Sequence, residues 1–147
     1  MDSNIYLDHF VEAHRYKFDD ALAELEAGEK ETHWMWFIFP IAEGLGKSEV
    51  AQYYAIGSLN EARAFLAHEV LGENYRKCIN AMLRNRDKSP LAILGKVDKW
   101  KFQASVTLFH HVTDDPSLKS QLQECLDHFY DGRRCKSTSR YLSAISG

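Results

Sequence analysis

Helix start and stop signals recur along this chain of 147 residues and divide it into short amphipathic segments. The first segment, residues 7–25, repeats apolar side chains at spacings of three and four, and Gly28 follows it as a C-terminal stop. Later segments open on residues that cap helix N-termini, namely Ser48, Ser58, Ser89-Pro90, Asp98 and Asp115-Pro116. We therefore predict an all-α fold of about six to eight helices joined by short loops.

The chain shows no linker, internal repeat or low-complexity segment. Its length suits a single hydrophobic core, so residues 1–147 are expected to form a single compact helical domain. The end of the chain is basic and polar up to Arg140 and then carries Tyr141, Leu142 and Ile145. Residues 135–147 are therefore expected to form a loosely docked tail.

Charge and hydropathy exclude several classes of protein. A net charge of -3 and a pI near 6.1 argue against a protein that coats DNA or anionic membranes. The basic residues Arg133, Arg134, Lys136 and Arg140 are typical of a solvated end, so nucleic acid is not an expected partner. No apolar run approaches the ~20 residues that span a bilayer. Because residues 1–8 lack a signal-peptide pattern and the three cysteines form no CxxC pair, we expect a soluble, cytoplasmic protein with reduced thiols and no membrane partner.

Aromatic residues, 12% of the chain, gather in two segments. The block Trp34–Phe39 predicts a short buried helix or an extended segment, because no later segment alternates as a partner strand would. In the second segment, Trp100–Phe109, the polar residues Lys101, Ser105 and Thr107 alternate with aromatic ones. Such segments line a pocket for a flat ligand, or they form an aromatic core whose hydroxyls bond to the preceding turn. The residues by themselves favour the core.

Motifs for metal and phosphate chemistry are missing from the sequence. The loop Gly44–Ser48 has neither the Walker nor the dinucleotide spacing of glycines, and there is no HExxH. On a helix, the neighbours His110 and His111 point about 100° apart and do not readily share an ion. Cys125 and His128 have no further ligand nearby in sequence. We predict neither a metal site nor a cofactor.

The block Thr32–Pro40, together with Gly44–Ser48 and Glu61–His68, closely resembles a small family catalogued as domain of unknown function 1810. Members of this family are sometimes mislabelled calpastatin, and the resemblance implies a mostly helical fold. The match continues through Tyr54–Ile56, Leu71-Gly72, Asp98, Lys101, Ser105, Thr107–Phe109, Gly132 and Thr138.

The chain departs from that family's pattern at four positions. Ile41 and His14 stand where the family commonly has glutamine. Ala104 stands in place of a serine, and Cys135 in place of an aspartate. If these polar positions bind a ligand in the family, the resemblance implies that binding is altered or weakened in this chain.

A more distant resemblance, to the NADAR group, rests on the pair Tyr53-Tyr54 and the helix start Lys101–Gln103. That group is linked to ADP-ribose and to hydrolysis of N-glycosidic bonds. It has a glutamate just before the tyrosine pair, where this chain has Ala51, while Glu49 lies nearer the N-terminus. The resemblance therefore supplies no carboxylate at this position to act as the acid or to stabilise an oxocarbenium-like transition state.

Our leading hypothesis combines the aromatic segments with these resemblances. We expect the protein to bind a nucleotide or an ADP-ribose-like ligand in an aromatic pocket. The hypothesis extends to hydrolysis of an N-glycosidic bond in that ligand. Lys101 would meet a phosphate, and Glu49 is the candidate for acid–base work. The expected ligand-binding residues are Trp34, Trp36, Ser48, Tyr54, Lys101, Ser105 and Thr107. The alternative is a non-catalytic protein-interaction domain in which the aromatic residues are only core.

Overall fold

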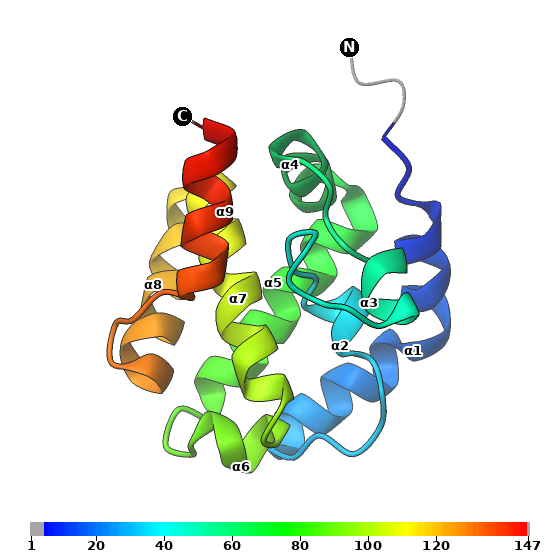
Figure 1. Ribbon diagram of the computed structural model, residues 1–147. Coiled ribbons are helices and arrows are strands. Elements are labelled where there is room, and N and C mark those ends of the chain that lie inside the picture. The colour runs from blue at the N-terminus through cyan, green and yellow to red at the C-terminus, as the bar shows by residue number, and fades with distance from the viewer. Residues whose placement is uncertain (1–4, 147) are drawn as a thin grey trace.

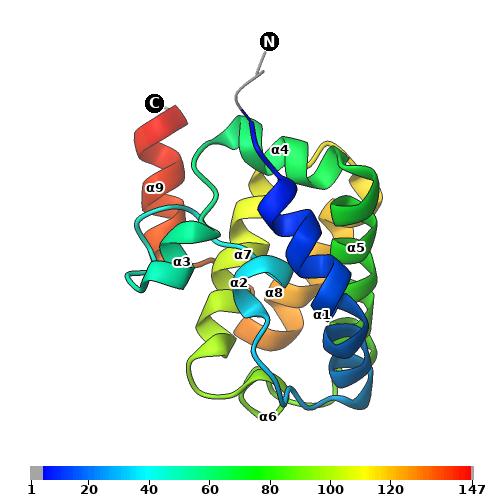
Figure 2. The same cartoon turned by 90° about the vertical axis from the view of Figure 1, so that its right-hand side faces the viewer.

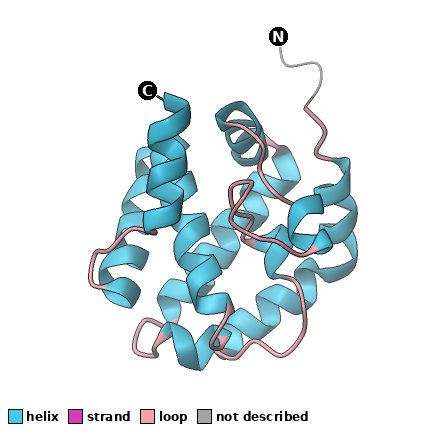
Figure 3. Cartoon of the chain, in the orientation of Figure 1, coloured by secondary structure: helices cyan, strands magenta, loops and turns pink. Residues whose placement is uncertain are grey.

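The computed structural model describes residues 5–146, and every regular element in that range is a helix (Figures 1 and 3). The helices are α1 (Asp8–Ala27), α2 (Met35–Ile38), α3 (Glu49–Tyr53), α4 (Leu59–Ala67), α5 (Glu69–Arg84), α6 (Pro90–Leu94), α7 (Asp98–Val112), α8 (Pro116–Tyr130) and α9 (Lys136–Ser146). The prediction of an all-α fold is confirmed. Residues 1–4 and 147, which belong to the predicted domain, lie outside the described residues.

The predicted serine caps are present. The hydroxyl oxygens of Ser48, Ser58 and Ser89 each accept a hydrogen bond from the backbone N–H three residues later, at 3.1, 3.0 and 3.1 Å. Each bond satisfies an N–H group that the first helical turn leaves without a partner. At the other end of a helix, Gly28 adopts a φ of 79° and closes α1, which is the stop that the sequence predicted.

Helix α7 runs through the middle of the molecule and packs against α8, α9, α4, α6 and α2 (Figures 1 and 2). All residues from 102 to 110 are buried, including Ser105 and Thr107. A helix that is buried on every side has neighbours all around it. Residues near both ends of α7 therefore face the surfaces between it and its neighbouring helices.

The tryptophan block forms the one-turn helix α2, buried among α1, α5 and α7, which confirms the prediction of a short buried helix. Trp34, Ile38 and Phe39 are at most 1% exposed. Phe39 packs edge-on against Phe102 of α7, with ring centroids 4.7 Å apart. The two aromatic segments of the sequence therefore meet in one core.

The tail of the chain is ordered as α9, which packs along α7 (Figure 1). Thr138 and Leu142, one turn apart, are buried against the rest of the molecule, while Ile145 remains 46% exposed. A spacing of four residues places both buried side chains on one helical face. No helix within residues 5–146 has the length and apolar character needed to cross a membrane.

Candidate functional site

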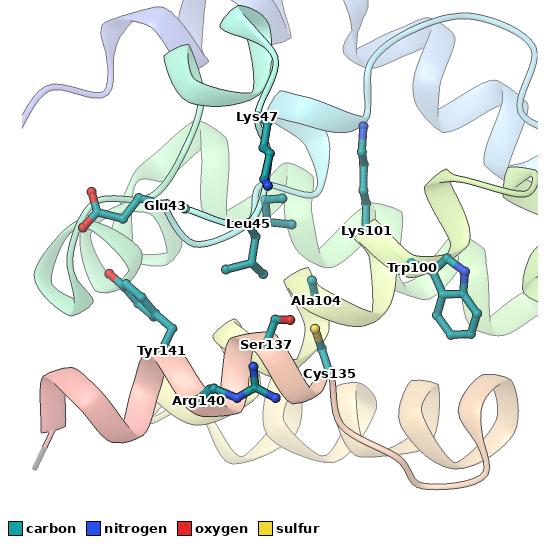
Figure 4. A pocket seen from close by; sticks show the side chains of 12 residues that line it. Glu43, Leu45, Lys47, Trp100, Lys101, Ala104, Cys135, Ser137, Arg140 and Tyr141 are labelled. Atoms are coloured by element: carbon teal, nitrogen blue, oxygen red, sulfur yellow. The ribbon is translucent and has the colours of Figure 1, made fainter.

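A groove of about 660 Å³ opens between the segment 41–47, the N-terminal end of α7 and helix α9 (Figure 4). Its volume lies in the range that small-molecule sites occupy, about 300–1,000 Å³. Its lining residues are Ile41, Glu43, Gly44, Leu45, Lys47, Trp100, Lys101, Ala104, Cys135, Ser137, Arg140 and Tyr141. Three segments far apart in the sequence therefore share one concave surface.

The groove carries an excess of positive charge. Lys47, Lys101 and Arg140 come from three different segments, and Glu43 is the one carboxylate among the described lining residues. Within residues 5–146, neither Lys47 nor Arg140 has an ion-pair partner. In Figure 4 the Lys47 side chain extends toward Leu45, and Arg140 lies along α9 on the opposite wall, near Ser137. Such an arrangement attracts an anionic ligand.

Lys101 has a more restricted environment than the other two cations. Its ammonium lies 3.8 Å from the Asp98 carboxylate and 5.5 Å from the ring centroid of Trp36. Asp98 also pairs at 3.0 Å with Lys30, whose side chain is only 8% exposed. The prediction that Asp98 caps α7 is wrong by one position: Asp98 is the first residue of the helix, and its carboxylate is paired with lysines. Asp98 neutralises part of the charge that Lys101 brings to the groove.

Three of the predicted ligand-binding residues meet at the inner edge of the groove. Trp36, Tyr54 and Lys101 line a narrow cleft of about 10 Å³ that shares Ile41 and Lys101 with the groove. This cleft is too small for a ligand, since a single water needs about that volume. Trp36 and Tyr54 thus pack next to groove residues without lining the groove themselves.

Trp34 belongs to the core and does not line the groove. Its indole N–H donates to Glu24 Oε1 at 2.9 Å, and the same carboxylate accepts bonds from the hydroxyl and N–H of Thr32 and from the Glu31 N–H. Burial acts to raise the pKa of Glu24, but these hydrogen bonds outweigh it and lower the pKa to about 2. Trp34 therefore fixes the loop that follows α1.

Ser105 and Thr107 use their hydroxyls inside the protein. Ser105 is fully buried and shares a hydrogen bond of 3.0 Å with the Tyr75 hydroxyl. Thr107 donates to the Gln103 carbonyl at 2.8 Å and accepts from the Cys135 N–H at 3.0 Å. Neither lines the groove, although Thr107 holds the backbone at one of its lining residues.

Ser48 and Glu49 also lie off the groove. Ser48 caps α3, and Glu49 is exposed in the first turn of that helix. A carboxylate there interacts favourably with the positive end of the helix. Of the seven residues expected to bind a ligand, the structure thus brings Lys101 into the groove, with Trp36 and Tyr54 directly behind it.

Sequence reasoning missed Glu43, Lys47, Arg140 and Tyr141, which all line the groove. The sequence signals for them were a glycine loop that matches no phosphate motif and a basic tail typical of solvated residues. Tyr141 reaches toward Glu43 from α9 (Figure 4). Its pKa is raised by burial and by the charges of Glu43 and Glu61.

Three of the positions at which the chain departs from the resembled family pattern also line the groove. Ile41, Ala104 and Cys135 come from a loop, from α7 and from the segment before α9. The fourth, His14, lies in the core, where it donates to the Phe37 carbonyl at 2.8 Å. Polar-to-apolar differences therefore concentrate on one surface.

Comparisons with known proteins agree on the fold. A family model described as protein of unknown function (DUF1810) matches residues 4–142. The crystal structure titled conserved hypothetical protein Rv1873 from Mycobacterium tuberculosis is similar, with a TM-score of 0.90 and 35% sequence identity. The match covers 95% of this chain and 97% of that chain. No functionally curated protein is a significant match.

Proposed function

We propose that this chain, which belongs to the DUF1810 family of proteins of unknown function, binds a phosphate-bearing, nucleotide-like small molecule in the groove beside α9. The observation that carries the proposal is the convergence of Lys47, Lys101 and Arg140 from three separate segments on one concave surface. The chain as a whole is negative, so this local excess of cations is not a consequence of composition. Lys47 and Arg140 pair with no carboxylate of the described residues, and Lys101 is only partly neutralised by Asp98, so the three are suited to a ligand phosphate.

The remaining lining residues suit the uncharged part of such a ligand. Trp100 is 56% exposed at the rim, and Tyr141 presents its ring from α9. Ile41 and Leu45 add apolar surface between them and the cations. A pocket with apolar and aromatic walls and a few charged groups is the usual form of a site for a ligand with a planar ring.

Calorimetric titration with ADP-ribose, NAD and GMP tests the proposal. Arg140→Gln and Lys47→Gln should each weaken binding by about tenfold or more, because each removes a hydrogen bond between charged groups. Arg84→Gln is the matched control, since Arg84 is an exposed cation on α5 that pairs with Glu26 and lies outside the groove. It should leave the affinity unchanged.

Absence of binding at millimolar concentration of all three compounds would overturn the proposal. The alternative, a non-catalytic protein-interaction domain with an aromatic core, would then be favoured. Equal weakening by Arg84→Gln would show instead that any effect is one of net charge.

A second proposal concerns the reaction: hydrolysis of an N-glycosidic bond in the bound ligand. It is favoured by the carboxylate that the groove contains. Glu43 would accept a proton from water, whose oxygen forms the new bond to the anomeric carbon as the carbon–nitrogen bond breaks. The electron pair of that bond leaves with the nitrogen base, which takes up a proton. Because Glu49 does not line the groove, Glu43 replaces it as the candidate for acid–base work.

Chromatography of NAD, ADP-ribose and GMP after long incubation tests the reaction separately from binding. The wild-type protein should release the base. The Glu43→Gln variant should release none, whereas the Glu49→Gln variant should release as much as the wild type. A wild-type protein that binds a ligand and releases no base would overturn the hydrolysis while leaving the binding proposal in place.

A further inference from the structure

A second hollow, of about 260 Å³, lies between the C-terminal half of α7, α8 and α9. The residues of this pocket that matter chemically are His110 and His111 of α7, Lys119 of α8, Arg134 of the segment before α9, and Ser139 and Ser143 of α9. No carboxylate is among its described lining residues.

The pocket and the groove occupy opposite flanks of α9. Groove residues on this helix are Ser137, Arg140 and Tyr141, and pocket residues are Ser139, Leu142 and Ser143. At about 100° per residue the centres of these two sets lie roughly 160° apart around the helix axis. The helix therefore separates the two hollows, and a ligand in one does not occupy the other.

Charge in the pocket is uncompensated. Within residues 5–146, Lys119 and Arg134 have no ion-pair partner, and they approach the same buried histidine, His110, which is 8% exposed. Their charges, with that of His111, oppose protonation of His110. Lys119 and Arg134 are themselves exposed, so they lie at the rim of the pocket beside the buried His110. An anion in the pocket would meet two cations that no described carboxylate neutralises.

We propose that this pocket is a binding site for a tetrahedral oxyanion, a phosphate that is either free or the end of a small monoester. Lys119 and Arg134 supply the charge, and the hydroxyls of Ser139 and Ser143 supply neutral donors. The volume is below the range typical of nucleotide-sized ligands, so the pocket accommodates the phosphoryl group and little more. It is a site for the anion itself rather than for a base or sugar.

Occupation of the pocket has a consequence for proton binding. Burial and the charges of Arg134, Lys119 and His111 lower the pKa of His110, while a hydrogen bond with Gln123 acts to raise it. An anion that neutralises those charges reverses the Coulombic part of this shift. The pKa of His110 therefore rises on binding, and the complex takes up protons near neutral pH.

Calorimetric titration and histidine NMR with inorganic phosphate and O-phosphoserine test the site. Lys119→Gln and Arg134→Gln should each weaken binding about tenfold or more, and phosphate should raise the pKa of His110. Lys136→Gln is the control, because Lys136 is an exposed cation two residues from Arg134 that does not line the pocket. The tighter of the two probes identifies the source of the phosphate, free anion or monoester.

Three outcomes would overturn the proposal. The first is no binding of either probe at about 10 mM by a folded wild-type protein. The second is equal weakening by Lys136→Gln, which indicates a general charge effect. The third is binding that Arg140→Gln abolishes and Arg134→Gln leaves unchanged, because the anion then sits in the groove. Far-UV circular dichroism establishes that each variant is folded.

Discussion

The two hollows that flank α9 are built from the same pair of helices and differ in almost every chemical respect. The groove, about 660 Å³, mixes three cations with a carboxylate and with the apolar side chains of Ile41, Leu45 and Trp100. The pocket, about 260 Å³, has polar and basic residues with Leu142 as its single aliphatic contact among the described lining residues. Apolar walls beside a cation suit a ligand with both a ring and a phosphate, whereas the pocket suits the phosphate alone.

The difference arises from which segments complete each site. The segment 41–47 closes the groove with loop residues of mixed character. Lys119, near the start of α8, and Arg134, in the segment after α8, close the pocket. Helices α7 and α9 are common to both. Substitutions can therefore be chosen that act on both hollows together, on neither, or on one.

The largest effect is expected for a substitution that loosens α9, the helix that forms a wall of both hollows. Leu142→Ala removes a buried side chain between α9 and the rest of the protein, and it should cost about 2–4 kcal/mol in the free energy of undocking α9. Both sites should weaken in parallel. Hydrogen exchange of the α9 amides measures the undocking, with Ile145→Ala as the exposed control on the same helix. Because Leu142 itself lines the pocket, the groove gives the decisive result: unchanged groove affinity in a variant whose α9 undocks more readily would contradict the idea that α9 is a wall of both hollows.

The next effect separates structural from ligand-facing tryptophans. Trp34→Phe removes the N–H donor to Glu24 and should lower the free energy of unfolding by about 1–3 kcal/mol. Affinity at both hollows should stay the same. Trp100→Phe, at an exposed position on the groove rim, should change stability by less than about 0.5 kcal/mol and weaken groove binding only. Urea unfolding measures the stability and calorimetry measures the affinity. A Trp34→Phe variant that loses affinity without losing stability, or a Trp100→Phe variant that loses stability alone, would contradict these roles.

A smaller effect distinguishes the hollows by pH. Sulfate stays a dianion near neutral pH, so its affinity for the pocket should increase a few-fold as pH falls from about 7.5 to 5.5 and His110 is protonated. Without an anion the sign reverses: the lowered pKa of His110 means that the unfolded state binds more protons, so stability falls as pH drops below the ordinary histidine value. His110→Asn should flatten the affinity profile and remove the His110 share of the stability profile, to which His9 and His14 also contribute because burial lowers their pKa values. If ligand affinity for the groove showed the same dependence on pH and on His110, the two hollows would not be independent sites.

The smallest effect concerns the buried face of α9 itself. The Thr138 hydroxyl is buried and makes no hydrogen bond with a described residue. Thr138→Val keeps the shape and removes this unsatisfied group, so it should stabilise the protein by up to about 1 kcal/mol and leave both hollows intact. Thr107→Val is the contrast, because it removes a hydroxyl with two hydrogen bonds and should destabilise by about 1–3 kcal/mol. Thermal unfolding measures both, and a destabilising Thr138→Val would contradict the account.

Much of the fold was predictable because its signals are local. The serine caps at Ser48, Ser58 and Ser89 and the stop at Gly28 each depend on residues within a turn of one another. The docking of the tail has no such local signal, because the burial of Thr138 and Leu142 on α9 depends on α7, which lies much earlier in the sequence. Local patterns predict that a helix exists more readily than what it packs against.

The candidate site was predictable only in part. Lys101 reached the groove, with Trp36 and Tyr54 behind it. Trp34, Ser105 and Thr107 were assigned to a ligand because tryptophan and hydroxyl side chains suit both a pocket and a core, and the choice depends on partners such as Glu24, Tyr75 and the Cys135 N–H. Those partners are far away in sequence, so spacing does not reveal them.

By itself the sequence determined the all-α fold, the serine caps that begin three of the helices and the glycine that ends α1. It did so because capping and amphipathic spacing act over a few residues. Only the tertiary structure decided that Lys47, Lys101 and Arg140 share a groove and that Lys119 and Arg134 share a pocket. Each of these cations is unremarkable in its own segment, and charge becomes concentrated only when the packing of α9 against α7 brings the segments together.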